Sequence, residues 1–442
     1  MKRSLEFSHR TVKSCLKVGG KYMPLQNKHL AVVLQNTYLP FIFEEAEALG
    51  IKVTFFYNQE EVKPKHLKNV QNFIPIDLFH TPDKALEIIK AEHHKNPFDG
   101  IMTLYEPALD VVSQLTEELN LPGLSPFVIS NCRNKQKMRE VLKDNDLNTP
   151  YFKEVENEEE LKNLSLPYPV VVKPSNGFSS QGVSRANNKK ELIDSIEKVR
   201  RVNEEDLSKF TKNKTGMVIE QFIDGPEFAI ETFSVEGKVY VLSIGYKGNS
   251  KGPFFEEGVY IAPAQLEENV WQSIAQEAAR AANALGIENG PAHIELRLDP
   301  AGKPYVIEIG ARIGGSGISH YIVKESTGIN YMELVFYYVL GLKPPVLKNE
   351  RKRKKVVGNY IIPVQGHGIF KEIRGLEDVR RDTEVKRVIQ FITKGTDILP
   401  YPHFSGYPGF ILTTHESYSD CEQYYSYLDN KVKIVYKNKV NA

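Results

Sequence analysis

Two apolar segments in the second half of the chain, PAHIELRLD and KPYVIEIGA, are each interrupted by one glutamate. A turn at residues 300–302 joins them, so the sequence predicts a β-hairpin that places Glu295 and Glu308 on neighbouring antiparallel strands. Two carboxylates side by side in a water-poor setting repel each other unless a cation lies between them. Mg²⁺ suits that position because it takes a few carboxylate oxygens and completes its octahedron with phosphate oxygens and water. The alternative is a pair of glutamates on a solvated strand face.

A second segment, VVVKPSNGFSSQG, has the composition of an anion-binding loop. Lys173 ends an apolar strand, and Ser179, Ser180 and Gly182 lie in the loop that follows it. Such a loop can turn backbone N–H groups and hydroxyls toward an anion, with the lysine as a point charge. Polar Gly/Ser loops are usually plain turns. Together with the carboxylate pair, however, this loop predicts a nucleoside-triphosphate site divided between two lobes.

The glycine-rich stretch IGARIGGSG, after the second hairpin strand, carries Arg312 four residues beyond Glu308. An arginine there is placed to reach a transferring phosphoryl group, and the alternative is a surface arginine at a strand end. The order of these motifs resembles the ATP-grasp superfamily. The segments GPAHIELR and EIGARIGGSGISH resemble its L-amino-acid ligase branch, whose enzymes condense two unprotected amino acids. The resemblance extends over nearly the whole chain. Gly310 stands where many ATP-grasp enzymes have an asparagine metal ligand, a departure that the amino-acid ligases share.

The resemblance implies roles for the charged residues. Lys135, in RNKQKMR, matches the lysine that approaches the α-phosphate of ATP, and Lys173 matches the second nucleotide lysine. Glu295 and Glu308 match the glutamates that bridge Mg²⁺, with two ions expected and Mn²⁺ as a substitute. Arg312 matches the catalytic arginine that steadies an acyl phosphate, and it is also a candidate for substrate binding.

The segment EQFIDGPE matches the interdomain hinge of the family. There Glu220 would bind the adenine amino group, and Glu227 would hold the ribose hydroxyls. The backbone of Gln221 and Ile223, on either side of Phe222, would pair with the edge of the purine ring. An apolar strand can flank a flat purine in this way while its backbone groups make directional hydrogen bonds.

The substrate side is predicted from the segment GPFFEEGVYIAPAQL, a candidate lid at residues 254–264. The ligase branch has a glutamate six residues before the proline. This spacing selects Glu257 as a catalytic residue that pairs with the free α-amino group of the first amino acid, and it leaves Glu256 as the competitor. The alternative is a solvated acid in a lid loop.

Four further residues are weaker candidates for substrate binding. His293 lies on the first hairpin strand and could face the acceptor amine, although a lone strand histidine is more often structural. Glu106 ends the strand DGIMTLYE at the carboxyl edge of the first predicted sheet, where ligands of α/β folds gather. Gly314 and Gly315 belong to the glycine-rich stretch after the hairpin.

Alternating apolar runs and amphipathic segments before about residue 125 predict an open, mostly parallel α/β sheet. No GxGxxG follows its first strand, which argues against a dinucleotide-binding domain. The expected fold class is α/β and α+β, an ATP-grasp fold with an α+β closing domain. The length of 442 residues agrees with roughly three domains. We expect an N-terminal α/β domain at 1–125, a central helical segment at 126–165, an ATP-grasp domain at 166–342 with its nucleotide lobe at about 166–245 and its metal-binding hairpin at about 290–312, and a C-terminal α+β domain at 343–442.

Composition argues against several other classes. With 57 Lys+Arg against 56 Asp+Glu, the net charge of +1 provides no global field that would attract nucleic acid. No apolar run is long enough to span a membrane, and the N-terminus lacks the apolar core of an export signal, so a cytoplasmic location is expected. Cys15, Cys132 and Cys421 have no spacing that suggests disulfides or a zinc site. The basic run 351–355 is interpreted as a solvated linker.

The expected function is an ATP-dependent carboxylate–amine ligase that forms an amide bond, in the first instance that of a dipeptide, and releases ADP and phosphate. Its expected partners are small-molecule amino-acid substrates, and the sequence leaves a homodimer open. One alternative is an ATP-grasp ligase that loads an amino acid onto a carrier protein or a natural-product precursor. A carboxylase would usually carry a biotin-carrier signature, which this sequence lacks. A regulatory nucleotide-binding module is disfavoured because Lys173, Glu295, Glu308 and Arg312 are all present.

Overall fold

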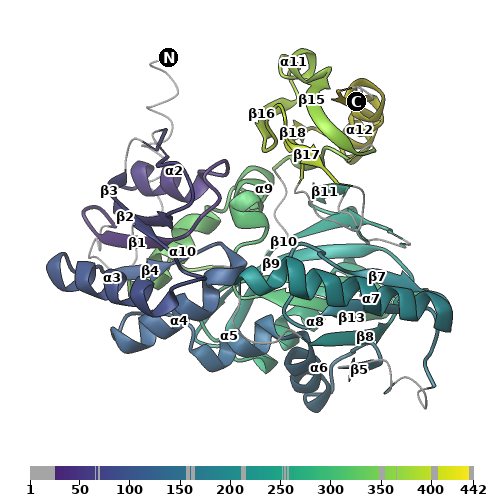
Figure 1. The fold of residues 1–442 in the computed structure, drawn as a ribbon, viewed down its shortest axis with the longest axis horizontal. Helices are drawn as coiled ribbons and strands as arrows, with labels where there is room; N and C mark the ends of the chain where they lie inside the picture. The colour runs from purple at the N-terminus through teal and green to yellow at the C-terminus, as the bar shows by residue number, and fades with distance from the viewer. Residues whose placement is uncertain are drawn as a thin grey trace, which may run out of the picture.

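The described part of the chain forms an N-terminal α/β unit, a central body and a C-terminal lobe that stands above the body (Figure 1). No helix in this part is long and apolar enough to cross a membrane. Cys132 and Cys421 are buried free thiols, whereas Cys15 and residues 351–353 of the basic run lie outside the described residues. The computed structural model describes residues 25–64, 66–67, 70–155, 160, 165–210, 216–250, 252, 255, 258–347, 354–364, 366–399 and 407–437.

The N-terminal unit contains a four-stranded parallel sheet in the order β3-β2-β1-β4. Successive residues of its central strand enter two different apolar cores: Leu30 packs in one, and Ala31 in the other. A strand buried on both faces needs a continuous apolar run, so the open parallel α/β sheet predicted here is confirmed. Its elements are β1 (His29–Val33), α2 (Phe41–Ala48), β2 (Lys52–Asn58), β3 (Val70–Ile76), α3 (Pro82–Lys95), β4 (Gly100–Met102), η1 (Glu106–Ala108) and α4 (Leu109–Glu118).

A small antiparallel sheet in the order β5-β8-β6-β7 lies beside the body and is covered by a long helix (Figure 1). Two short helices connect the N-terminal unit to it. The sheet includes β5, which falls in the expected helical segment 126–165, so the observed sheet begins before the expected nucleotide lobe. The elements are α5 (Pro126–Arg133), α6 (Lys135–Asp144), β5 (Phe152–Val155), β6 (Val170–Pro174), β7 (Ser184–Ala186), α7 (Lys189–Glu205), η3 (Leu207–Phe210) and β8 (Met217–Gln221).

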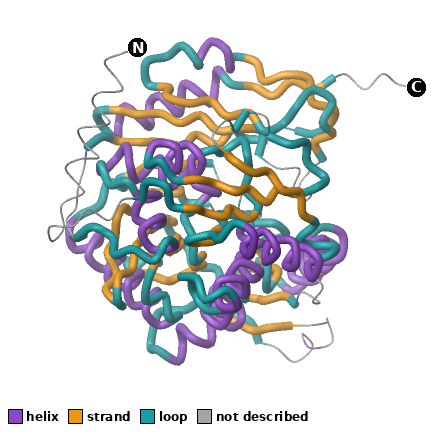
Figure 2. Tube along the Cα trace, turned by 90° about the vertical axis from the view of Figure 1, so that its left-hand side faces the viewer, coloured by secondary structure: helices purple, strands orange, loops and turns teal. Residues whose placement is uncertain are grey.

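The central sheet has eight antiparallel strands in the order β13-β12-β9-β10-β11-β14-β18-β16. It includes β9 and β10, which begin within the expected lobe 166–245, and also three strands from beyond residue 343. The pairing of β11 with β14 carries the sheet into the C-terminal lobe, and Figure 2 shows strands following one another up through the molecule. The strands are β9 (Glu227–Val235), β10 (Lys238–Gly248), β11 (Val259–Ala262), β12 (Gly290–Leu298), β13 (Pro304–Gly310), β14 (Val356–Ile361), β16 (Val385–Gln390) and β18 (Gly409–His415).

The remaining helices cover this sheet or close the C-terminal lobe. The alanine-rich segment 268–284 forms an amphipathic helix, and Ile274 and Ala278 pack in the same core as Ile294 of the hairpin. A three-stranded sheet in the order β17-β15-β19 completes the lobe. The elements are α8 (Glu268–Ala284), η4 (Gly315–Gly317), α9 (Ile318–Thr327), α10 (Tyr331–Val339), β15 (Gly368–Arg374), α11 (Leu376–Val379), β17 (Asp397–Ile398), α12 (Tyr418–Lys431) and β19 (Lys433–Tyr436).

Candidate active site

Glu295 on β12 and Glu308 on β13 are direct cross-strand partners, as the hairpin prediction requires. Each carboxylate is paired with a lysine from a different element. Lys247 Nζ, on β10, lies 2.5 Å from Glu295 Oε1, and Lys135 Nζ, on α6, lies 3.1 Å from Glu308 Oε1. The two ammonium groups offset the repulsion that two facing carboxylates would otherwise feel.

Lys135 joins three parts of the chain. It is the first residue of α6, and its backbone N–H donates to the carbonyl of Ser175 at 2.8 Å. Its buried Nζ also donates to the carbonyl of Gly177 at 2.7 Å, in addition to its bond to Glu308. The lysine therefore ties the loop after β6 to the hairpin.

Glu220 on β8 lies in a buried cluster of cations. Arg139 binds it with two parallel bonds, Nε to Oε1 at 2.9 Å and Nη2 to Oε2 at 3.1 Å, and Lys173 Nζ lies 2.7 Å from Oε2. The fully buried Arg139 also donates to the carbonyls of Val306 and Ile307 on the hairpin. Arg139 was not among the predicted residues, although it lies four residues after Lys135 and thus on the same face of α6.

This cluster shifts two pKa values. Burial raises the pKa of Glu220, but Arg139 and Lys173 lower it by more, so that it falls to about 2. Burial lowers the pKa of Lys173 to about 8, helped by the positive charges of Arg139 and Lys135 and opposed by Glu220. Lys173 is therefore a cation that can lose its charge in a mildly alkaline medium.

The loop between β6 and β7 contains strained backbone at the predicted anion-binding residues. Ser179 and Ser180 both have a φ of 52°, the left-handed region that residues with a Cβ rarely adopt. Such strain is typical of ligand clamps, which supports a binding role for the loop. Gly182 has a φ of +72°, and a Cβ added there would lie 3.3 Å from Pro174 and from Val202, so this glycine serves the turn itself.

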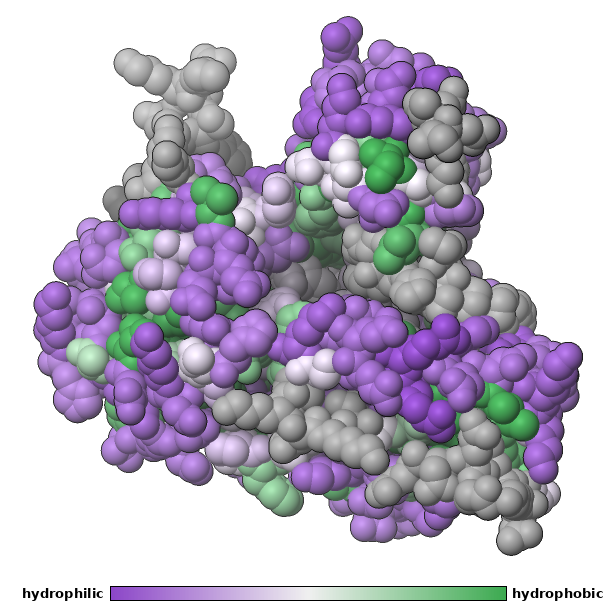
Figure 3. Space-filling view, viewed as in Figure 1, coloured by the Kyte–Doolittle hydropathy of each residue, from purple (hydrophilic) through white to green (hydrophobic). Residues whose placement is uncertain are grey.

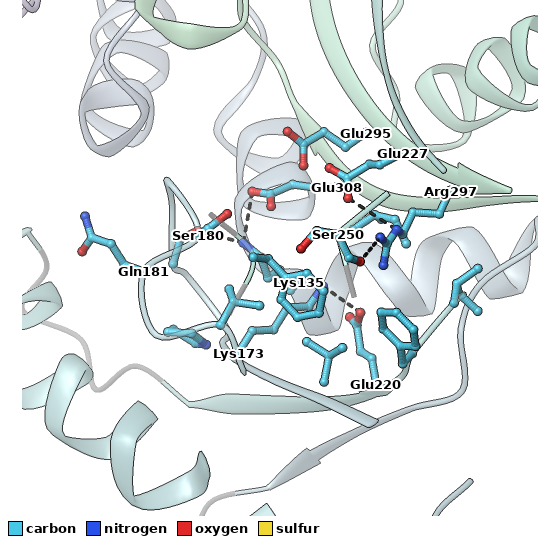
Figure 4. A pocket seen from close by; sticks show the side chains of 18 of the residues that line it. Lys135, Lys173, Ser180, Gln181, Glu220, Glu227, Ser250, Glu295, Arg297 and Glu308 are labelled. Carbon is cyan, nitrogen blue, oxygen red and sulfur yellow. Dashed lines mark hydrogen bonds and ion pairs between the residues drawn. The ribbon is translucent and has the colours of Figure 1, made fainter. Parts of the chain in front are cut away.

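A cavity between the small sheet and the central sheet brings most of the predicted nucleotide residues together (Figure 4). We call it the nucleotide cavity. In Figure 4 the carboxylates of Glu295, Glu308 and Glu227 lie on one side of it, and Lys173 and Glu220 lie on the other. Its lining includes Lys135, Lys173, Gly177, Ser180, Glu220, Gln221, Phe222, Ile223, Glu227, Lys247, Phe255, Glu295, Arg297 and Glu308.

The wall of the nucleotide cavity beside Glu227 carries two cations that the sequence analysis missed. Lys247 Nζ lies 3.2 Å from Glu227 Oε1, and Arg297 Nε lies 3.5 Å from Glu227 Oε2. Arg297 also donates to the carbonyl of Ser250 at 2.6 Å, and its guanidinium lies 5.0 Å from the ring centre of Phe222. Burial raises the pKa of Glu227, opposed by Lys247. This wall therefore holds an aromatic ring and two cations where the purine and ribose were predicted.

A second, larger cavity of about 1090 Å³ adjoins the first, and we call it the substrate cavity. The molecular surface is hollowed between the C-terminal lobe and the rest of the molecule (Figure 3). The aromatic wall on the side of the C-terminal lobe includes Phe391 and Phe410. The residues that line both cavities are Phe178, Ser180, Gln181, Glu295 and Glu308, and predicted residues that line only the substrate cavity are Ser179, His293, Arg312 and Gly315.

Arg312 and Glu106 form an ion pair between the glycine-rich stretch and the N-terminal unit. Burial raises the pKa of Glu106, but Arg312 and Arg133 lower it by more, so that it lies below its usual value. Arg133 Nε is 3.9 Å away from the same carboxylate. Glu106 is absent from the lining of both cavities, so its contact is with the arginine that lines the substrate cavity.

The side chain of His293 is held between two carboxylates. Its Nδ1 lies 2.5 Å from Oε1 of Glu231, and its Nε2 lies 3.3 Å from Oε1 of Glu295. Burial lowers the pKa of His293, but Glu231 and Glu295 raise it by more, to about 10. Gly314 packs against this pair and lines neither cavity. Glu231 was not predicted, although it interrupts an apolar strand just as the two hairpin glutamates do.

The lid prediction falls largely where the chain is not described. Glu256 and Glu257 both lie outside the described residues. Phe255 is described, and it lines the nucleotide cavity near Phe222, with their ring centres 6.0 Å apart. From residue 258 onward the segment leads into β11.

Comparison with known protein families finds three matching domains that follow one another along the chain. An ATP-grasp N-terminal domain matches residues 43–123, an ATP-grasp domain matches 166–320, and L-amino acid ligase C-terminal domain 2 matches 360–437. An L-arginine-specific L-amino acid ligase of Bacillus subtilis is 27% identical over 308 residues, which are 66% of this chain and 68% of that protein. Carnosine synthase 1 of Mus musculus is 23% identical over 374 residues, 78% of this chain and 44% of that protein. The chain thus spans less than half the length of several curated relatives that it matches.

A solved structure of an L-amino acid ligase from Bacillus licheniformis is 56% identical to this chain, with a TM-score of 0.89. The match covers 93% of this chain and 100% of that one. It confirms the ATP-grasp fold expected from the motifs. With this identity along a whole ligase and the three matching domains in order, the chain belongs to the L-amino acid ligase family of ATP-grasp proteins.

Proposed function

We propose that this protein uses ATP to join the carboxylate of one amino acid to the amine of another through an acyl phosphate. One observation carries the proposal: Glu295 and Glu308 line both the nucleotide cavity and the substrate cavity. A γ-phosphate extending from the first cavity and a carboxylate in the second would meet at these two side chains. The 56% identity to a solved L-amino acid ligase supports amino acids as the substrate class.

In the nucleotide cavity, we assign Lys135 and Lys173 to the phosphates and Glu227 to the ribose. Glu220 is assigned to the adenine amino group, and the backbone of 221–223 to the ring edge. Glu220 accepts bonds from Arg139 and Lys173 at its two oxygens. A carboxylate has about four lone-pair sites, so one acceptor site is left for an amino group.

Glu295 and Glu308 fit Mg²⁺ as facing carboxylates on adjacent strands. In the described part of the chain, no group of three or more His, Cys, Asp or Glu side chains forms a metal site by itself. This agrees with Mg²⁺, which commonly binds through one or two carboxylates and otherwise through substrate phosphates. We propose two ions, replaceable by Mn²⁺, which when bound neutralise charge on the phosphates.

In the first step, a carboxylate oxygen of the donor amino acid attacks the γ-phosphorus, and the bond from that phosphorus to the bridging oxygen of ADP breaks. Arg312, which lines the substrate cavity, stabilises the charge on the transferring group, and Glu106 holds the arginine in place. In the second step, the acceptor amine attacks the acyl carbon, loses a proton, and phosphate leaves. The products are an amide, ADP and phosphate.

The acyl phosphate must be kept from water, because hydrolysis would waste ATP. The segment 254–264 is our candidate for the lid, and Glu257 within it is our candidate for binding the donor's α-amino group. Phe255 supports a closing role because it packs near Phe222 at the nucleotide cavity. We place the reaction in the cytoplasm, where ATP and free amino acids occur together.

Phosphate release from MgATP tests the proposal, first with single amino acids and then with pairs. We expect selected pairs to stimulate release, with a product whose mass equals that of the two amino acids less one water. Stimulation only by a thiol-tethered aminoacyl carrier would contradict the proposal. Phosphate release that stays at background with every amino-acid pair tested would also contradict it.

A further inference from the structure

Beside the metal-binding hairpin, β9 of the central sheet carries a buried acidic residue, Glu231. Its cross-strand partner on β12 is His293, which in turn precedes Glu295 by two positions on the same strand. Residues two apart on a strand point to the same face, so His293 and Glu295 stand side by side. Glu231, His293 and Glu295 thus form a continuous line from the core to the cavity wall.

Glu231 is fully buried, and among the described residues His293 is its one ion-pair partner. A buried carboxylate without a cationic partner would be strongly destabilising, so the ring is held firmly at Nδ1. The hydroxyl of Tyr260 also donates a hydrogen bond to Oε1 of Glu231, at 3.5 Å. Fixing Nδ1 also fixes the direction of Nε2, which faces Glu295 at 3.3 Å.

Gly314 packs closely against His293 and Glu231. A Cβ at this position would lie 2.4 Å from Nδ1 of His293, 2.6 Å from Oγ of Ser319 and 2.8 Å from Oε1 of Glu231. Its φ of −62° suits any residue, so the glycine is explained by space and not by conformation. The backbone of the glycine-rich stretch therefore lies directly against the imidazole.

We propose that His293, held by Glu231, is a positioning residue that sets the orientation of Glu295 toward the metal. The inference rests on the proposed metal site, and it reassigns His293 from the acceptor amine, because both ring nitrogens already face carboxylates. Groups that hydrogen-bond to a metal ligand fix its orientation, and their loss typically weakens metal binding about 10- to 100-fold. Gly314 provides the space that this arrangement needs.

Binding of Mn²⁺ to the full chain with ADP, followed by electron paramagnetic resonance, tests this without turnover. We expect His293→Asn and Glu231→Gln to raise the Mn²⁺ dissociation constant about tenfold. Glu295→Gln is the reference for loss of a ligand. His415→Asn is the matched control, because His415 is also a buried strand histidine of the central sheet, bonded to Thr413 at 2.9 Å.

Wild-type Mn²⁺ affinity in folded His293→Asn and Glu231→Gln, with loss in Glu295→Gln, would overturn the positioning role and leave the proposed function standing. Unchanged affinity in Glu295→Gln as well would overturn the metal site and the positioning role together. Thermal unfolding of each variant establishes that it is folded.

A second pair of variants tests the packing directly. Gly314→Ala should weaken Mn²⁺ binding by displacing the imidazole. In a His293→Ala background the same change should weaken Mn²⁺ binding by less, because the imidazole is gone and only the close approaches to Ser319 and Glu231 remain. If the two substitutions weaken Mn²⁺ binding additively in the double variant, Gly314 does not act through the imidazole of His293, and its proposed role is overturned.

Discussion

Lys247 and Glu295 form a 2.5 Å ion pair at the wall of the nucleotide cavity, and Glu295 also lines the substrate cavity. A lysine at that position gives the carboxylate a cation partner, just as Lys135 does for Glu308. Each hairpin glutamate therefore has a cationic partner, and the side chain of Glu308 keeps 35% of its surface exposed, against 19% for Glu295. They are two carboxylates with flexible counter-charges, which suits a site where a divalent ion and a nucleotide bind.

Loss of either hairpin carboxylate should abolish turnover. We expect Glu308→Gln to lower kcat by more than about 100-fold, because metal ions contribute several kcal/mol of charge stabilisation in phosphoryl transfer. Phosphate release at saturating ATP and amino acids measures this. Glu372→Gln, which changes an exposed strand glutamate of β15, is the control and should keep wild-type activity. Turnover by Glu308→Gln at the control rate would remove the metal assignment.

Nucleotide affinity should fall as the pH rises through about 8. Burial lowers the pKa of Lys173 to about 8, so the free protein loses this cation well before an ordinary lysine would. The charged form predominates below that pH, and phosphate binding favours it. The ADP dissociation constant, measured by calorimetry between about pH 7 and pH 9.5, should show this inflection, and Lys173→Met should remove it. A flat profile in the wild-type protein contradicts the role of Lys173.

Removing Arg139 should destabilise the fold. Arg139→Met leaves the buried carboxylate of Glu220 without its two-bond partner, which typically costs about 3–5 kcal/mol. Equilibrium unfolding in urea measures the loss. Because the folded-state pKa of Glu220, about 2, lies below the ordinary value of 4.5, the stabilisation from its ionised form is present above pH 4.5 and is lost as the pH falls through about 2. Adding Glu220→Gln to Arg139→Met should recover part of the loss, and a further additive loss would contradict the buried pair.

Glu106 should affect the chemical step more than nucleotide binding. Glu106→Gln weakens the hold on Arg312, so we expect kcat to fall about tenfold or more while the ADP dissociation constant stays unchanged. Asp110→Asn is the matched control, since it breaks only the outer contact of Arg133. Equal effects of both substitutions on kcat would show that Arg312 does not depend on Glu106.

The hairpin could be predicted from sequence because it is local: a short turn sets the register that makes Glu295 and Glu308 partners. The long-range contacts could not. Arg139 and Glu220 are 81 residues apart, and His293 and Glu231 are 62 apart. A charged residue in an apolar strand signals that a partner exists without identifying it.

The extent of the central sheet was hidden for a similar reason. Short strands beyond residue 343 resemble those of a separate lobe, and only the pairing of β11 with β14 shows that they continue the same sheet. The contact of Glu106 with Arg312 likewise depends on how the N-terminal unit packs on the body. The motif order identified the family, but the sequence could not identify which residues hold the functional ones in place.

The most direct test follows the oxygen atoms. If the donor amino acid carries oxygen-18 in its carboxylate, attack on the γ-phosphorus leaves one labelled oxygen in the phosphate released when the amine displaces it. We predict one oxygen-18 per phosphate by mass spectrometry, with ADP formed in equal amount to the dipeptide. Unlabelled phosphate, or AMP in place of ADP, would contradict an acyl phosphate formed between the two cavities.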